Sequence, residues 1–184
     1  GETVHFTGVF DDPDTTAAHT IAWDFGDGSP GASTLEANHT YADSGSYTAR
    51  LTITSSKGKS VTRTVAVTVT NAAPSVSIIA DEFFEEGTAG SASASVSDAG
   101  VLDTFSYLWN MGDGSTYDTP EVSHAYASAG SYTITLTVTD KDGGVGTATQ
   151  SVTVKHRAPD VNAGSDQSCI NEGQTVRFAG TVNG

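Results

Sequence analysis

The sequence predicts an all-β chain of repeated antiparallel sandwiches, and three observations carry that prediction. Apolar residues alternate with Thr and Ser over short runs, which is typical of strands with one buried face. Twenty glycines against a single methionine indicate many turns, and no segment has the 3.6-residue periodicity of an amphipathic helix. Blocks of sequence also recur about 85 residues apart, which is the pattern of a tandem array.

The repeat is clearest in two blocks that keep their order along the chain. Trp23–Ser29 returns as Trp109–Ser115, 86 residues later, and His39–Thr48 returns as His124–Thr133, 85 residues later. Because both blocks keep nearly the same offset, the chain consists of copies of one module joined end to end.

These offsets divide the chain into three stretches. We expect residues 1–72 to form a module that lacks its first strand, residues 73–157 to form a complete module, and residues 158–184 to begin a third. Pro74 marks the leading strand of the complete module, and Pro159 repeats it in the third copy. We interpret the chain as a window on a longer array, with strand exchange between chains as the alternative use of such ends.

Short alternating runs bounded by turn residues predict the individual strands. In the first copy these runs are Val4–Phe10, Ile21–Phe25, Tyr47–Thr54 and Val61–Thr70. In the second copy they are Val76–Ile79, Ala92–Val96, Phe105–Met111, Tyr132–Thr139 and Gly146–Val154. A module of about 85 residues with about seven short strands matches an immunoglobulin-like sandwich.

Three repeated positions are expected to shape each module. A tryptophan in the inward phase of a strand should anchor each core. The Gly-Asp-Gly that follows makes a tight turn, in which the aspartate accepts backbone N–H groups. A tyrosine then opens the next long strand, much as in a tyrosine corner. These structural residues are Trp23, Asp27, Tyr47, Trp109, Asp113 and Tyr132.

Two linked motifs resemble those of PKD domains, the modules named for the polycystic kidney disease protein. They are Trp-Asp-Phe-Gly-Asp-Gly-Ser at 23–29 and His-x-Tyr-x-x-x-Gly-x-Tyr-Thr at 39–48. The second copy carries both motifs, with Asn110 for the first Asp and Met111 for Phe. The resemblance implies a non-catalytic β-sandwich used outside the cell, as a spacer or binding module of surface proteins, adhesins and secreted proteases or glycosidases.

Charge and composition argue against several classes of function. With 8 Lys and Arg against 22 Asp and Glu, the formal net charge of −14 disfavours binding to nucleic acids or to anionic membranes. No apolar run approaches the ~18–20 residues of a membrane span. Cys169, the single cysteine, cannot form an intramolecular disulfide. It remains either a small buried residue or an intermolecular link or reactive thiol. No catalytic constellation is visible, so we expect no enzyme activity.

Asp-rich loops of the second copy form the one candidate metal site. In such a sandwich the module entry, the loop after the second strand and the last hairpin lie at one pole. They supply the candidate ligands Asn71, Asp98, Asp103, Asp140 and Asp142. Oxygen ligands from three loops suit Ca²⁺, and the resemblance implies the same, since some bacterial PKD domains hold calcium at this pole. The alternative is that Asp and Gly only make the turns.

Proline-containing junctions without glycine favour a stiff rod over a flexible string. We therefore expect an extracellular structural or adhesive array, such as a stalk, filament or surface-layer component, with calcium as a candidate stiffening cofactor. Its expected partners are other copies of the module and cell-surface or matrix components. The alternative is an accessory module of a secreted hydrolase that binds a polysaccharide or fibrous protein. Its candidate contacts are Phe83, Phe84, Tyr107 and Tyr117. Asn38 also opens a glycosylation sequon.

Overall fold

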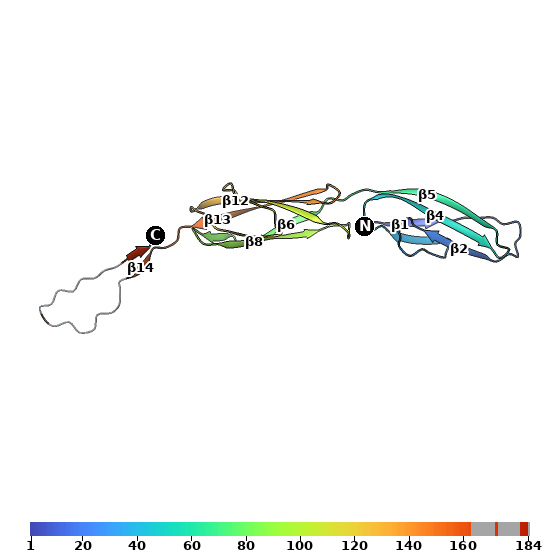
Figure 1. Ribbon diagram of the computed structural model, residues 1–184, viewed down its shortest axis with the longest axis horizontal. Helices are drawn as coiled ribbons and strands as arrows, with labels where there is room; N and C mark the ends of the chain where they lie inside the picture. Colours follow the sequence, from blue (N-terminus) through green and yellow to red (C-terminus); the bar gives the residue numbers. More distant parts are fainter. Residues whose placement is uncertain (163–171, 173–180, 184) are drawn as a thin grey trace.

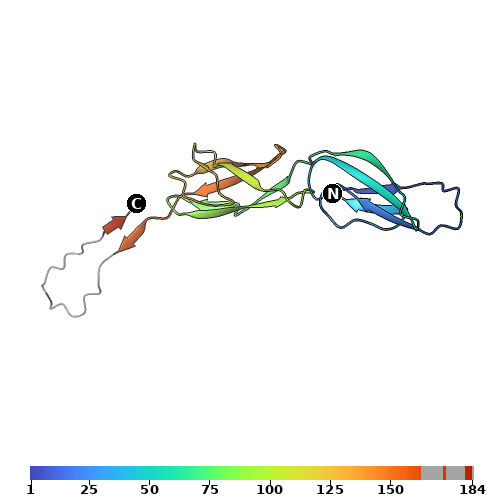
Figure 2. The ribbon, with the colours of Figure 1, turned by 45° about the vertical axis from the view of Figure 1, so that its right-hand side comes forward.

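The computed structural model describes residues 1–162, 172 and 181–183, and every regular element among them is a β-strand. Figure 1 shows two sandwiches that lie end to end, and the turned view in Figure 2 keeps the same extended arrangement. No helix of the described residues is long and apolar enough to span a membrane. The all-β prediction is therefore confirmed.

Module one contains the first five strands. They are β1 (Thr3–Thr7), β2 (His19–Asp24), β3 (Glu36–Thr40), β4 (Gly45–Ser55) and β5 (Ser60–Val69). One sheet pairs β1 with β3 and the other has the order β2-β4-β5, with every pairing antiparallel. Phe6, Trp23 and Leu51 are among the side chains that meet between these sheets.

Module two contains the next eight strands. They are β6 (Ser75–Ala80), β7 (Phe83–Glu85), β8 (Gly90–Ser97), β9 (Phe105–Asn110), β10 (Thr116–Tyr117), β11 (Glu121–His124), β12 (Gly130–Asp140) and β13 (Val145–Lys155). One sheet has the order β10-β9-β12-β13-β7 and the other the order β11-β8-β6. Only β7 with β13 is a parallel pair among the described strands. Farther on, β14 (Asp160–Asn162) pairs with β15 (Thr181–Asn183), and most of the expected third copy lies outside the described residues.

Each core is anchored by its tryptophan and by a buried tyrosine. Trp109 is fully buried and its indole N–H donates to Thr119 O at 2.8 Å, while Trp23 donates in the same way to Thr34 O at 3.0 Å. The hydroxyl of Tyr126 donates to Met111 O at 3.0 Å. Both side chains thus bury a large apolar body while their polar tips keep a partner.

The repeated Gly-Asp-Gly turn is fastened to the second motif by its histidine. Asp27 Oδ2 lies 2.7 Å from His39 Nε2, and Asp113 Oδ2 lies 2.8 Å from His124 Nε2. The first glycine of the turn, Gly26, has φ +82°, and a Cβ there would strike the carbonyl of Thr48. The two motifs are separate in sequence, but this aspartate–histidine contact joins them in one polar cluster in each module.

The strand predictions differ from the structure in two respects. Four short strands, β3, β7, β10 and β11, were not predicted. The strand predicted over Val4–Phe10 also ends at Thr7, and Val9 beyond it is 88% exposed. In module two the equivalent strand β8 continues because β6 pairs with it as far as Ser97. Among the described residues of module one no strand takes the place of β6, so the alternating pattern has no partner there.

Candidate functional site

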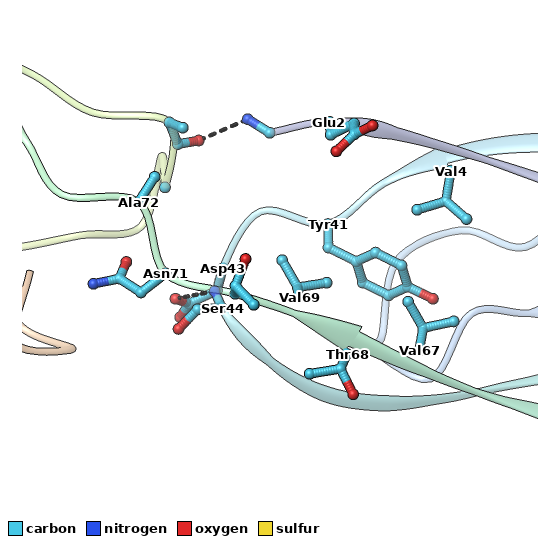
Figure 3. A pocket seen from close by; sticks show the side chains of 14 residues that line it. Glu2, Val4, Tyr41, Asp43, Ser44, Val67, Thr68, Val69, Asn71 and Ala72 are labelled. Carbon is cyan, nitrogen blue, oxygen red and sulfur yellow. Dashed lines mark hydrogen bonds between the residues drawn. The ribbon is translucent and has the colours of Figure 1, made fainter.

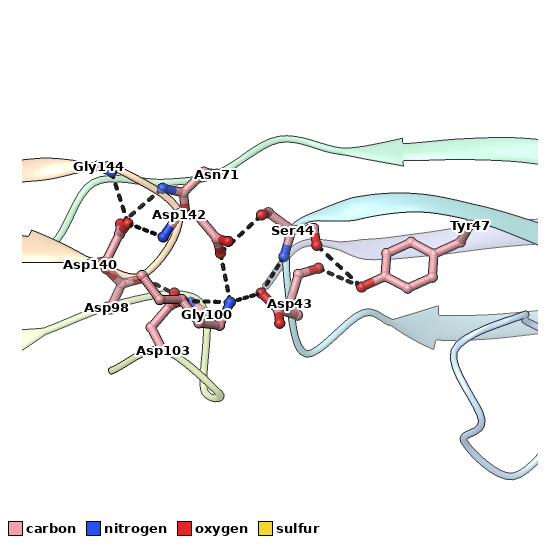
Figure 4. A network of polar contacts seen from close by, with 11 residues as sticks. Asp43, Ser44, Tyr47, Asn71, Asp98, Gly100, Asp103, Asp140, Asp142 and Gly144 are labelled. Carbon is pink, nitrogen blue, oxygen red and sulfur yellow. Dashed lines mark hydrogen bonds and ion pairs between the residues drawn. The ribbon is translucent and has the colours of Figure 1, made fainter. Parts of the chain in front are cut away.

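The two modules meet at a cluster of carboxylates and one lysine. Module one contributes Asp43 and Ser44 from the turn before β4, and the linker contributes Asn71. Module two contributes the loop after β8 and the β12–β13 turn. Figure 4 shows these side chains converging from both sides of the junction.

Asp140 ties the linker to the last hairpin of module two. Its side chain is buried, Asn71 Nδ2 donates to Oδ2 at 2.9 Å, and the backbone N–H of Gly144 donates to Oδ1 at 2.8 Å. The bond from Asn71, opposed by burial and reinforced by the backbone bonds, lowers the pKa of Asp140 below its usual value. A side chain at Gly144 would overlap Asp140 Oδ2 and Asn71 Nδ2, so it would displace the bond between them.

Three carboxylates of module two come together beside this linker bond. One oxygen each from Asp98, Asp103 and Asp140 lies within 4.8 Å of the others. Asp98 Oδ2 and Asp103 Oδ1 are buried and accept no hydrogen bond, and the Asp103 side chain is only 1% exposed. Buried carboxylate oxygens without donors are costly unless a cation neutralises them. An all-oxygen donor set from one loop and a strand end is the kind that Ca²⁺ accepts.

Lys141 neutralises a second group of carboxylates that spans the junction. Its ammonium lies 2.5 Å from Asp43 of module one, 2.6 Å from Asp142 and 3.0 Å from Asp103. Hydrogen bonds to Asp142 and Asp43 raise the pKa of Lys141 despite some burial, so the lysine stays charged. The contact to Asp103 Oδ1 is an ion pair without hydrogen-bond geometry, and it leaves that oxygen shared between the two groups.

The structure brings all five predicted ligands to the junction, in two groups that share Asp103. Asn71, Asp98, Asp103 and Asp140 are adjacent. Asp142 lies with Asp43 and Asp103, with one oxygen of each within 4.8 Å of the others, and accepts a hydrogen bond from the Ser44 hydroxyl at 3.1 Å. Sequence reasoning missed the roles of Asp43, Ser44 and Lys141. Comparison of the two copies does not single out Asp43 as a repeated residue, because Ser128 stands at the equivalent position. The binding of calcium itself stays a prediction.

The structural residues named from sequence lie around the junction and the cores. The hydroxyl of Tyr47 donates to Asp43 O at 3.1 Å, and that of Tyr132 donates to Ser128 O at 2.9 Å. Asp27 Oδ1 and Asp113 Oδ1 each accept the N–H of the serine two residues on. The bond from Tyr47 holds the backbone of Asp43, and so places its carboxylate opposite Lys141.

A hollow of about 350 Å³ adjoins this cluster on the side of module one. Figure 3 shows Tyr41, Val67 and Val69 on one side of it and the linker residues Asn71 and Ala72 on the other. The lining is apolar within the sandwich and polar at the linker. The hollow is therefore an opening into the core of module one rather than a second carboxylate site.

The four aromatic residues considered for substrate binding do not form an exposed strip. Phe84 is 5% exposed and packs against Tyr126, whereas Phe83 is 56% exposed and lies under the Lys155 ammonium. Tyr107 is half-buried against the core, and the Tyr117 hydroxyl lies 3.0 Å from His124. Among these four, only Phe83 is largely exposed, and Lys155 covers one face of its ring.

Comparison with known proteins finds one family and several relatives. The family model described as PKD domain matches residues 1–69 and 71–155 as separate copies. Human polycystin-1 is 33% identical over 117 residues, which is 61% of this chain, and the chain spans only 3% of that relative's length.

Two solved structures are also similar, and both are single domains of bacterial proteins. The PKD1 domain of Vibrio anguillarum Epp is 30% identical, with a TM-score of 0.42, covering 48% of this chain and all of that domain. The PKD1 domain of the Vibrio cholerae metalloprotease PrtV is 33% identical, with a TM-score of 0.39, covering 45% of this chain and 98% of that domain.

Proposed function

This chain belongs to the PKD domain family, and from that premise we propose that it is a non-catalytic extracellular rod that spaces and connects parts of a surface or secreted protein. The observation that carries the proposal is the junction. Lys141 and Asp142 of module two contact Asp43 and Ser44 of module one, and Asn71 of the linker is bonded to Asp140. Contacts on both sides of a short linker restrict the pivoting that two tethered sandwiches would otherwise have.

We further propose that Ca²⁺ stiffens this rod at Asp98, Asp103 and Asp140. Support comes from the buried Asp98 Oδ2, which accepts no hydrogen bond and forms no ion pair with the described residues, and from the all-oxygen donor set. Asp103 Oδ1 also accepts no hydrogen bond, although Lys141 lies 3.0 Å from it. A bound calcium ion would offset two of the three negative charges and link the loop after β8 to the β12–β13 hairpin. Because Asp140 also holds Asn71, order at this site would extend to the linker.

Calorimetric melting with millimolar Ca²⁺ or with excess chelator tests the metal site. We expect calcium to raise the melting temperature of module two in the native chain but not in Asp98→Asn. This substitution keeps an oxygen for the Gly100 N–H and removes the charge of the buried Oδ2. Without calcium the variant should melt no lower than the native chain, because it relieves repulsion among the carboxylates.

Asp118→Asn is the matched control, since Asp118 is exposed and distant in sequence from these loops. It should respond to calcium as the native chain does. Equal melting temperatures with calcium and with chelator would return the aspartates to turn formation alone. The rod proposal would then stand on the lysine contacts and the linker.

A further inference from the structure

Lys141 lies beside the candidate calcium site, and one carboxylate belongs to the surroundings of both. The calcium site consists of Asp98, Asp103 and Asp140. The lysine ammonium is surrounded by Asp43, Asp103 and Asp142, which we call the lysine group. In each group one oxygen of every member lies within 4.8 Å of the others. A cation that binds in one group must therefore act on the other group through Asp103.

Two of the three contacts of Lys141 are hydrogen bonds and one is not. Its ammonium donates to Asp43 Oδ1 at 2.5 Å and to Asp142 Oδ2 at 2.6 Å. The contact to Asp103 Oδ1 is longer, at 3.0 Å, and lacks hydrogen-bond geometry. Lys141 can therefore give up Asp103 while both of its hydrogen bonds stay in place.

Asp103 needs a cation more than the other members of the lysine group do. Its side chain is 1% exposed, whereas those of Asp43 and Asp142 are 28% and 31% exposed. Water can solvate the exposed carboxylates, but a buried carboxylate without a countercharge is costly. Among the described residues, Lys141 is the one that forms an ion pair with Asp103. In the metal-free chain the ammonium thus takes the place of a bound cation at this oxygen.

The loop after β8 holds Asp103 in place, so the lysine is the partner that can move. The N–H of Asp103 donates to Gly100 O at 3.0 Å, and the N–H of Gly100 donates to Asp98 Oδ1 at 2.8 Å. A Cβ at Gly100 would strike Asp103 Oδ2, so this carboxylate is packed against its own loop. The lysine side chain is 29% exposed, and its flexible stem lets the ammonium change position.

Calcium and the ammonium cannot share Asp103 Oδ1 without repulsion. Calcium lies about 2.3–2.6 Å from its oxygen ligands, so an ion bound to this oxygen would be within about 6 Å of an ammonium that is 3.0 Å from it. Charges of +2 and +1 repel strongly at that separation in a partly buried site. Figure 4 shows Asp43 and Asp142 on the side of the cluster that faces module one. The ammonium is therefore displaced toward module one.

We propose that Lys141 is an internal competitor of Ca²⁺ at Asp103. In the metal-free chain the ammonium substitutes for the ion, and when calcium binds it leaves Asp103 and is held by Asp43 and Asp142 alone. The competition keeps the calcium affinity of the site low. It also links occupancy of the site to the contact between the modules, because Asp43 belongs to module one. This inference rests on the proposed calcium site and adds the regulation of that site.

Calcium titration of the native chain and of Lys141→Met by isothermal titration calorimetry tests the competition. The variant should bind Ca²⁺ at least about tenfold more tightly, since a positive charge is removed from beside the ion. Lys141→Arg keeps the charge, so its affinity should lie much closer to that of the native chain than to that of Lys141→Met. Circular dichroism should report folded protein for each variant.

Lys155→Met is the matched control, because it removes the same charge from the other end of β13, where Lys155 lies over Phe83. Its calcium affinity should equal that of the native chain. The control separates competition at Asp103 from the effect of net charge. Equal gains in Lys155→Met and Lys141→Met would overturn the inference, because net charge alone would then explain them.

Nuclear magnetic resonance of the lysine side chains follows the ammonium directly in the native chain. The ¹³Cε resonance of Lys141, assigned by its absence from Lys141→Arg, should shift when calcium is added. The resonance of Lys57, which pairs with Asp14 at the outer pole, should stay where it is. A Lys141 resonance that saturating calcium leaves unmoved would overturn the displacement.

The outcomes for the inference and for the calcium site can be told apart. If the native chain binds calcium and Asp98→Asn does not, the site stands. A Lys141→Met variant that then binds calcium no more tightly than the native chain overturns the competition alone. If neither the native chain nor Lys141→Met binds calcium at millimolar concentration, the proposed site and this inference are rejected together.

Discussion

Module two closes its core more completely than module one, although the two repeat the same motifs. Trp109 and Leu136 are fully buried, whereas their counterparts Trp23 and Leu51 are 7% and 9% exposed. Both modules have the same Gly-Asp-Gly turn with its histidine and the same buried tyrosine. The difference teaches that the motifs build the turn and the sheet interior, while the leading segment β6–β7 closes the sandwich.

The two modules also differ in the loops that form the candidate site in module two, because the equivalent loops at the outer pole of module one hold different residues. Ser55 stands where module two has Asp140, and Lys57 pairs with Asp14 within its own module. Asp12 is likewise paired, with His19. Equivalent loops thus form either a cluster of carboxylates with unpartnered oxygens or a set of local pairs, depending on a few residues.

The largest expected effect comes from emptying the two cores at one equivalent position. Leu136→Ala should lower the free energy of unfolding of module two by about 2–5 kcal/mol, since a buried leucine leaves a cavity. Leu51→Ala should cost module one less, because Leu51 is 9% exposed and already borders a hollow. Each module has a single tryptophan, so fluorescence during urea unfolding follows module one through Trp23 and module two through Trp109 in single-tryptophan variants. Equal losses would contradict the claim that the cores are closed to different degrees.

A smaller and equal effect is expected from the buried tyrosines. Tyr41→Phe and Tyr126→Phe each leave a buried carbonyl without its donor, Phe25 O or Met111 O. Each should lower the stability of its own module by about 1–3 kcal/mol. The same unfolding experiment measures both changes. A marked difference between the modules would mean that the less complete closure of module one also weakens its motif cluster.

The pH dependence of module one should report the Asp27–His39 pair. Burial alone would raise the pKa of Asp27, but hydrogen bonds from Ser29 and His39 outweigh it and lower the pKa from 3.8 to about 2. Because the folded pKa lies below the unfolded one, the carboxylate stabilises the fold above pH 3.8. That stabilisation is lost as the pH falls toward the folded pKa.

Asp27→Asn should therefore flatten the acid limb of the stability curve of module one, measured by urea unfolding at a series of pH values. Asp11→Asn, at an exposed position of the same module, is the control and should leave that limb unchanged. An Asp27→Asn variant whose acid limb keeps the native slope would contradict the assignment.

A modest effect on stability, and one confined to the junction, is expected from Lys141→Met. Its pairs with Asp43 and Asp142 are partly exposed and contribute at most about 1 kcal/mol. Loss of the pair with the buried Asp103 adds to this, so the melting temperature should fall. Loss of the contacts to Asp43 should also widen the range of angles between the modules, which small-angle scattering measures. Lys57→Met removes a lysine from the outer pole and should leave the scattering as it is. An unchanged profile for Lys141→Met would place the stiffness in the linker alone.

Much of the fold could be predicted because alternation and repetition are local properties of the sequence. The long strands β4, β12 and β13 follow their alternating runs closely. The short strands β7 and β10 carry too few residues to show a period, and they form because a neighbour offers a free edge. The opposite discrepancy occurs at Phe10, where the alternating pattern predicted a strand but no described strand pairs with the residue.

The candidate site also has a part that could be predicted from the sequence and a part that could not. Asn71, Asp98, Asp103 and Asp140 could be grouped from sequence because the topology of a single sandwich brings their loops to one pole. Asp43 and Ser44 belong to the other module, and no periodicity encodes how two modules meet. Lys141 could be seen in the sequence, but its role depends on those two residues.

The parallel pair of β7 and β13 has a consequence for a chain under tension. The N–H of Thr153 donates to Glu82 O, and the N–H of Glu86 donates to Lys155 O, each at 2.9 Å. These bonds join the first and last segments of module two, so a pull on its two ends loads them together in shear rather than opening them one by one.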